Sequence, residues 1–327
     1  MIIDCHAHLV PPALLPELLA RAGEFPDVRL FEEAGSVGFS FAGGKPTRPV
    51  ARGLTDVAAR VAWMDKNGID LQVVAGWVDM FGYELPTAQG VAWARAANQA
   101  MARFAMENPR FLPLASIPMQ DGGAAAEVLT EAMAAGFRGA MIGTQPNGRG
   151  SVLDDPSLNP FWEAADRTGA VLIVHPVFDS GDSRNEDYGM PNAVGRITDT
   201  LIAVSRLLYA GHVQRYAGMK FVAPIGGAAL PFILGRLKRN ASLDAKLADP
   251  EDGLRRMWYD TLLHDPRTLR FVAEIVGEDR LMLGSDAPFP IGDLTPRAIL
   301  REAGFGGSSL AAMEGGTAAA LFGIADR

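Results

Sequence analysis

The chain has 327 residues, of which 48% are hydrophobic and 21% charged, and its formal net charge is −8. This composition is ordinary for a globular protein with a large core, and the length fits two average domains or one large α/β barrel. Because the balance is acidic and no basic run stands out, nucleic acid and anionic membrane surfaces are not expected as partners.

The first predicted strand, residues 1–6, leads directly into the motif His6-Ala7-His8. Residues two apart on a strand point to the same face, so the two imidazole rings are expected to share one space. Taken alone, such a pair is more often an ordinary part of a strand than a pair of metal ligands.

The segment that follows, residues 11–52, is rich in glycine and proline and has only weak periodicity. We interpret it as an insertion over the mouth of a barrel, because it follows the first strand directly. Its Arg48 and Arg52 are candidates for holding a substrate carboxylate, since the guanidinium group matches a carboxylate bidentately. For either arginine, a solvated loop charge is an equally good interpretation.

Further along, short apolar runs alternate with longer helical patterns. The runs predict strands at residues 70–77, 111–118, 139–144, 171–176, 220–225, 257–262 and 280–286, and the clearest helical patterns lie at 55–67, 87–108, 123–135 and 159–168. Thr55 is the expected N-cap of the first of these helices, and Gly68 is its expected C-cap. The alternation predicts a single α/β domain over residues 1–327, a closed (β/α)₈ TIM barrel with one insertion.

Polar side chains stand at the carboxyl ends of three predicted strands. His6 and His8 follow the first strand, His175 lies at the end of the fifth, and Asp286 ends the eighth. In a (β/α)₈ barrel these ends meet at one mouth, where the active site lies. The pattern predicts one divalent metal ion held by these four residues: most readily Zn²⁺, with Mn²⁺, Fe²⁺ or Co²⁺ as alternatives. Such an ion polarises a substrate oxygen or activates a water molecule.

Other residues near these strand ends are candidates for the substrate pocket. Trp77 ends the second strand and would stack on a flat ring, although a core position explains it equally well. Phe178 follows the third metal ligand and is expected to line the pocket, with residues 180–192 forming a loop beside it. His212 is expected on an outer helix and His264 in a turn, so neither is expected at the metal.

Several short segments match one known family. They are residues 3–8 (IDCHAH), 64–70, 142–144 with 147–148, 159–162, 175–176, 229–232 and 284–289 (GSDAPF). With these, the chain resembles the amidohydrolase-related superfamily, and within it the aminocarboxymuconate-semialdehyde decarboxylase group, which includes decarboxylases of hydroxylated benzoates. The resemblance implies one metal ion on the four residues above, a homodimer, and non-oxidative decarboxylation of a small carboxylated aromatic or muconate-like substrate.

One position departs from the pattern of that family. Its members have His-Gly-Gly-Gly at the end of the sixth strand, where the histidine helps to activate the metal-bound water and to move protons. This chain has Ile225 there, preceded by Pro224. Isoleucine can neither take nor give a proton, and proline is unusual in a central strand. Asp286 is then the predicted catalytic residue, because a ligand carboxylate can also accept a proton from a metal-bound water.

Two alternatives to decarboxylation therefore stay open: metal-dependent hydrolysis of a cyclic amide, lactone or related bond, and a metal-binding relative without catalysis.

Cysteine content and hydropathy indicate the cellular location. The single cysteine excludes an internal disulfide, and no uncharged apolar run reaches the roughly 18 residues that span a bilayer. We expect a cytoplasmic protein that acts on a small-molecule substrate.

Overall fold

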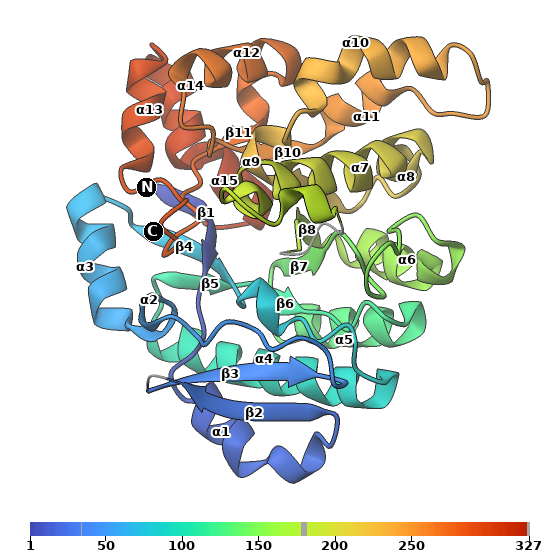
Figure 1. Cartoon of the computed structure of the whole chain (residues 1–327). Helices are drawn as coiled ribbons and strands as arrows, with labels where there is room; N and C mark the ends of the chain where they lie inside the picture. Colours follow the sequence, from blue (N-terminus) through green and yellow to red (C-terminus); the bar gives the residue numbers. More distant parts are fainter. Residues whose placement is uncertain (34, 178–181, 326–327) are drawn as a thin grey trace.

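The computed structural model describes residues 1–33, 35–177 and 182–325. At its centre lie parallel strands, with helices packed around them (Figure 1). In chain order the central strands are β1 (Ile3–His8), β4 (Leu71–Ala75), β5 (Phe111–Pro113), β6 (Ala115–Ser116), β7 (Gly139–Gly143), β8 (Val171–His175), β9 (Lys220–Ala223), β10 (Trp258–Asp260) and β11 (Leu281–Met282).

Hydrogen bonds join these strands into one continuous ring. β1, β4 and β5 form one parallel sheet, and β6 to β11 form a second in which neighbours follow the chain order. β5 and β6 are separated only by Leu114, whose N–H donates to the carbonyl of Val74 at 2.8 Å. On the other side, the N–H of Cys5 donates to the carbonyl of Leu283 at 2.8 Å, which joins β1 to the end of β11. The predicted α/β barrel fold is thereby confirmed.

Helices follow the strands and bury their apolar faces against them. From α3 onward they are α3 (Val57–Asn67), α4 (Thr87–Glu107), α5 (Gly122–Ala134), α6 (Asn159–Thr168), α7 (Arg196–Tyr209), α8 (His212–Arg215), α9 (Pro224–Gly227), α10 (Leu230–Ala241), α11 (Pro250–Arg256), α12 (Pro266–Val276), α13 (Pro296–Glu302), α14 (Gly307–Ala311) and α15 (Thr317–Phe322). In α12 the buried residues Leu269, Val272, Ala273 and Val276 recur at the spacing of one helix face. None of the helices in the described ranges is long and apolar enough to cross a membrane.

The predicted helix at residues 55–67 is present as α3, which begins two residues later, and Thr55 is the last residue of the preceding short helix α2 (Arg52–Thr55). The prediction that Thr55 is the N-cap is wrong, because the side chain of Asp56 caps α3 by accepting the N–H of Ala59 at 3.0 Å. Gly68 ends α3 as predicted, with φ of 63° in the left-handed region that glycine adopts at little cost.

The sixth barrel strand, β9, ends at Ala223, two residues before the predicted end. Pro224 therefore starts a turn, where it needs no ladder hydrogen bond. Ile225 has φ of 57° and ψ of 48°, a left-handed conformation that β-branched residues rarely adopt. Conversely, β1 continues to His8, two residues past its predicted end, so both histidines of the first motif lie on the strand.

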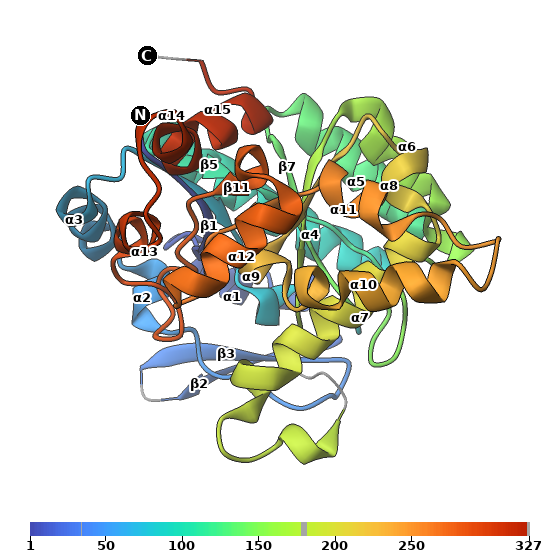
Figure 2. The ribbon, with the colours of Figure 1, turned by 90° about the horizontal axis from the view of Figure 1, so that it is seen from above.

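Residues 11–52 contain regular structure that weak periodicity did not predict: helix α1 (Leu14–Ala20) and an antiparallel hairpin of β2 (Val28–Glu33) and β3 (Ser36–Phe41). Phe39 and Phe41 of the hairpin pack against the ring of Trp93 on α4, with ring centroids 5.5 and 5.3 Å away. Seen from above, the hairpin lies at the end of the barrel where the strands finish, as do residues 182–195, which precede α7 (Figure 2).

Candidate metal centre

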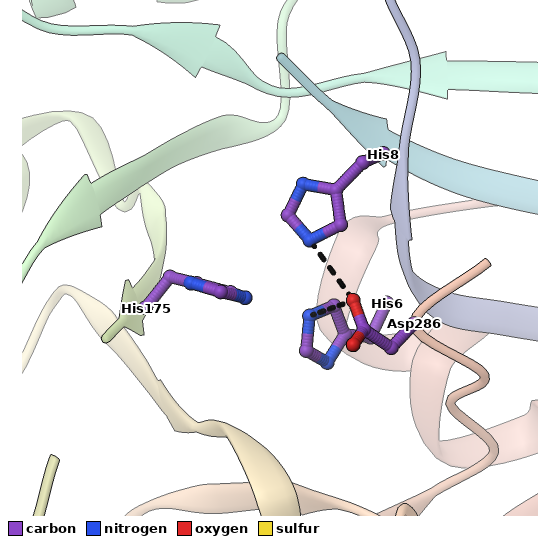
Figure 3. Close-up of side chains that lie close together, drawn as sticks. All are labelled: His6, His8, His175 and Asp286. Carbon is purple, nitrogen blue, oxygen red and sulfur yellow. Dashed lines mark ion pairs between the residues drawn. The ribbon is translucent and has the colours of Figure 1, made fainter. Parts of the chain in front are cut away.

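Four polar side chains converge at the carboxyl ends of the strands (Figure 3). His6 and His8 come from β1, His175 from the last position of β8, and Asp286 from the segment after β11. One potential ligand atom of each lies within 4.8 Å of all the others, and even the most exposed, Asp286, is only 6% exposed. Asp286 has φ of 57°, a strained conformation of the kind found at functional sites. The structure thus brings together all four predicted metal ligands.

Hydrogen bonds on the outer nitrogen of each imidazole determine which nitrogen faces the centre. The Nδ1 atoms lie 2.6 Å from Asp260 Oδ2 for His6, 3.1 Å from the Gly76 carbonyl for His8 and 2.8 Å from the Pro176 carbonyl for His175. These oxygens accept hydrogen bonds, so each Nδ1 carries the proton and donates it. In its neutral form, each ring presents its Nε2 lone pair to the centre, which is the form in which imidazole binds a metal.

Three of the converging atoms lack a hydrogen-bond partner in the part of the chain that the structure describes. Nε2 of His6, Nε2 of His8 and Oδ1 of Asp286 are buried and make no hydrogen bond within the described residues. Oδ1 of Asp286 nevertheless lies 3.2 Å from Nε2 of His8 and 3.7 Å from Nε2 of His6. An unprotonated nitrogen and a carboxylate oxygen are both electron-rich, so a buried cation between them stabilises this approach. The donor set fits one divalent metal ion.

Burial and charge shift the pKa values of the three histidines in different directions. Burial lowers the pKa of His8, and burial together with the charges of His8 and His6 lowers the pKa of His175 well below its usual range. Burial acts the same way on His6, but its hydrogen bond to Asp260 and the nearby carboxylates raise the pKa of His6 to about 9. His8 and His175 are therefore ready to bind a cation, whereas metal binding at His6 displaces a proton at neutral pH.

Asp260, at the end of β10, is a site residue that the sequence reasoning missed. Besides its contact with His6, its Oδ1 accepts the N–H of Gly226 at 2.9 Å and the N–H of Leu262 at 3.2 Å. Burial raises the pKa of Asp260, but the hydrogen bond and charge of His6 outweigh it and lower that pKa. Asp260 is thus an ionised group that holds the ring of His6 in place. The available signal was its position near the end of a predicted barrel strand.

The turn after β9 supports Asp260 with its backbone. Gly226, with φ of 56°, points its N–H at Asp260, and a Cβ there would lie 2.6 Å from a methyl carbon of Leu263. Ile225 precedes it in the left-handed region. The turn at Ile225 and Gly226 is therefore part of a backbone cradle for Asp260.

A buried polar network joins β1, which carries His6 and His8, to the segment after β11 that carries Asp286. Asp4 on β1 accepts the Ser285 hydroxyl at 2.5 Å and the side-chain amide of Gln72 at 2.8 Å. Arg60 donates to Gln72 at 2.7 Å and to the carbonyl of His8 at 2.9 Å. Because every member is paired, the network fixes β1 against the segment that leads into the fourth ligand.

Two of the predicted substrate residues lie together at the mouth. Nη2 of Arg48 lies 3.2 Å from Oδ2 of Asp79, and its guanidinium carbon lies 5.7 Å from the centroid of the Trp77 ring. Trp77 is only 2% exposed and packs in the core just after β4. The contact with Arg48 is a cation–π interaction that orients the guanidinium group just after the end of β4.

The remaining candidates lie elsewhere. The side chain of Arg52 is 90% exposed and pairs with Asp56, so it is not brought together with Arg48. Phe178 lies outside the described residues. His212 is buried on α8, and His264 is exposed in a turn with φ of 57°, away from the cluster of ligands as expected.

Comparison with known proteins places this site in a family. The model of the amidohydrolase family matches residues 3–324. The 2-amino-3-carboxymuconate-6-semialdehyde decarboxylase of Dictyostelium discoideum is 30% identical over 306 residues, which cover 91% of this chain and 84% of that protein. The crystal structure of 5-carboxyvanillate decarboxylase from Sphingomonas paucimobilis matches with a TM-score of 0.82 and 26% identity over 99% of both chains.

A second solved 5-carboxyvanillate decarboxylase, from Novosphingobium aromaticivorans, shares the fold with a TM-score of 0.79 and 18% identity. The match covers 99% of this chain and 96% of that one, which was crystallised with manganese and 4-hydroxy-3-methoxy-5-nitrobenzoic acid. The family match spans nearly the whole chain and includes all four converging side chains. The chain belongs to the amidohydrolase family.

Proposed function

We propose that this chain is a metal-dependent decarboxylase that removes CO₂ without oxidation from a small carboxylated aromatic or muconate-like substrate. The observation that carries the proposal is the convergence of three Nε2 atoms and one carboxylate in a chain that is 30% identical to such a decarboxylase. Zn²⁺ is our first choice of metal, because imidazole and carboxylate are among its usual ligands. Mn²⁺ is the second choice, since a solved relative holds it.

The metal and the rim of the site have separate roles in this proposal. When bound, the metal supplies a Lewis acid for the substrate carboxylate and a neighbouring oxygen. Arg48 offers a planar set of donors to an ionised group of the substrate, and Asp79, 3.2 Å away, keeps that guanidinium at the mouth. The buried walls around the ligands keep bulk water from the reacting groups and strengthen these electrostatic contacts.

Asp286 is the group to which we assign proton transfer. Loss of CO₂ breaks a carbon–carbon bond and leaves the electron pair on the remaining carbon, which must receive a proton. The Asp286 carboxylate takes up one proton from water and passes it to that carbon, so that the substrate carboxylate and one proton become the product and CO₂. Ile225 can neither give nor take a proton, and the nearby carboxylate of Asp260 is held by three hydrogen bonds.

The test is turnover of two substrate panels by the metal-loaded protein. Hydroxylated benzoates and carboxylated muconate analogues should release CO₂, and Asp286→Asn should keep the fold by circular dichroism while lowering kcat by about 10³-fold or more, within the range for loss of an essential acid–base group. Hydrolysis of lactones or cyclic amides without CO₂ release would contradict the proposal in favour of hydrolysis. Metal binding with neither reaction would indicate the non-catalytic relative.

A further inference from the structure

The outer nitrogen of His175 has a partner that is adjacent in the chain, unlike those of His6 and His8. Nδ1 of His175 donates to the carbonyl of Pro176, the next residue, at 2.8 Å. β8 ends at His175, so the peptide group that joins Pro176 to Val177 lies outside the strand, and the ladder of the sheet does not set its orientation. What turns this carbonyl toward the imidazole ring has to be another contact of the same peptide group.

Asp199 makes that contact from the first turn of α7. Its side chain is buried, and its Oδ2 accepts the N–H of Val177 at 3.2 Å. The same N–H lies 3.3 Å from Oγ1 of Thr144, and the Thr144 hydroxyl donates to the same Oδ2. A trans peptide group is planar, with its C=O and N–H on opposite sides. The carboxylate that holds this N–H therefore also sets the direction of the carbonyl to which His175 donates.

The carboxylate of Asp199 is itself held in place. The side-chain amide of Gln145 donates to its Oδ1 at 3.1 Å, and the oxygen of that amide accepts the N–H of Gly150 at 2.7 Å. Thr144 directly follows β7, and its own N–H donates to the carbonyl of His175 at 3.2 Å. The helix dipole also favours an acidic group in the first turn of α7. Asp199 is therefore a fixed anchor between α7 and the ends of β7 and β8.

We propose that Asp199 is a positioning residue for the metal, acting on His175 through the peptide group that follows Pro176. Hydrogen bonds in a chain polarise one another, so the bond that the N–H donates to Asp199 makes the carbonyl a better acceptor for the imidazole proton. That acceptor keeps the proton on Nδ1 and leaves the Nε2 lone pair for the metal. Asp260 acts on His6 by direct contact, whereas Asp199 acts across one peptide group.

The first measurement compares the zinc affinity of Asp199→Ala, Asp199→Asn and Asp154→Ala by competition with a chelator. Asp154 is the matched control, because its carboxylate also holds α7, pairing with Arg206 at 2.6 Å about two turns further along the helix. Asp199→Ala should lower zinc affinity about tenfold, as expected for the loss of such a partner. Asp199→Asn keeps an acceptor for the N–H and should stay within about threefold of the wild type. Asp154→Ala should bind zinc as tightly as the wild type.

Nuclear magnetic resonance gives a readout that a looser attachment of α7 would not produce. In the zinc-loaded protein with isotope-labelled histidines, the Nδ1–H proton of His175 should move upfield and exchange faster with water in Asp199→Ala. The Nδ1–H protons of the other two metal-bound rings should not change, and Asp199→Asn should restore the signal of His175. If Asp199→Ala does not fold, Thr144→Val decides instead. It keeps the volume, removes the second acceptor of the same N–H and should produce the same change to a smaller extent.

Unchanged zinc affinity and unchanged imidazole signals in Asp199→Ala, or in Thr144→Val where that variant decides, would overturn the inference. Equal losses of zinc affinity in Asp199→Ala and Asp154→Ala would also overturn it, because the effect would then come from the attachment of α7. The inference rests on the proposed function only through its metal, so the two fail separately. A zinc-loaded wild type that releases no CO₂ from any substrate contradicts the decarboxylase, whereas the zinc affinities and the signal of His175 decide the role of Asp199.

Discussion

Buried histidines occur in two regions of this molecule with opposite surroundings. At the metal centre, each of His6, His8 and His175 has an oxygen partner on Nδ1, and the opposite nitrogens converge. In the other region, His212 packs against Trp162 and Tyr216, with ring centroids 5.4 and 5.5 Å away. Neither nitrogen of His212 makes a hydrogen bond in the part of the chain that the structure describes.

The difference shows what turns a buried histidine into a ligand. An acceptor on one side of the ring fixes the proton on that nitrogen and aims the lone pair of the other. Without such an acceptor, the ring of His212 serves as an aromatic packing group between α6 and α8. Burial alone is thus a poor guide to function, and the partner of the second nitrogen is a better one.

Removing one of the three converging imidazole rings should have the largest effect, which is loss of the bound metal. His175→Ala deletes one of three imidazole ligands, so we expect bound metal to fall from about one ion per chain to nearly none, and turnover to fall by about 10³-fold or more. His212→Ala is the control and should keep the metal. Metal content by elemental analysis decides the matter, and a fully loaded His175→Ala protein would disprove the ligand assignment.

Changing the residue that hydrogen-bonds to Nδ1 of a converging histidine should have a smaller effect on metal affinity. Asp260→Asn removes the ionised acceptor of the His6 proton, so metal affinity should fall by about 10–100-fold, the usual effect of losing such a partner. Competition with a chelator measures it. Asp249→Asn, at the N-cap of α11, is a matched control on the surface and should leave metal affinity unchanged. Equal metal affinities of Asp260→Asn and Asp249→Asn would show that Asp260 does not support metal binding.

The convergence of His6, His8, His175 and Asp286 could be predicted from sequence because each lies at or just after an apolar strand, and a barrel brings all such ends to one mouth. Asp260 also stands at a strand end, yet it carries no motif. Its role depends on meeting His6, which lies 254 positions away in the chain.

Two elements of local structure could not be predicted from the sequence: the turn after β9 and the hairpin β2–β3. Pro224 and Ile225 were assigned to a strand, but the left-handed turn there is imposed by its contact with Asp260 and cannot be read from an isoleucine. The sequence does not predict the hairpin β2–β3, because its alternation of apolar residues, Phe39 and Phe41, is short and interrupted by glycines. Both segments take their conformation from tertiary packing.

The smallest expected effect is a change in how the free energy of unfolding depends on pH, and it comes from the titration of His212. Burial, assisted by the charge of Arg215, outweighs Asp154 and lowers the pKa of His212 in the folded protein. In the unfolded chain the histidine takes up a proton near pH 6.5, so the unfolded state binds more protons below that pH. The stabilising contribution is therefore present above about pH 6.5 and is lost as the pH falls towards the folded pKa.

His212→Phe keeps the aromatic packing and removes the titration, so its free energy of unfolding should fall less between pH 7 and pH 5.5 than that of the wild type. Urea unfolding at both pH values and constant salt measures the difference. His264→Phe, at an exposed position, controls for the change of a histidine to phenylalanine as such. A wild-type slope in His212→Phe would show that the ring is protonated or solvated in the folded state, and the contrast between the two histidine regions would lose its electrostatic basis.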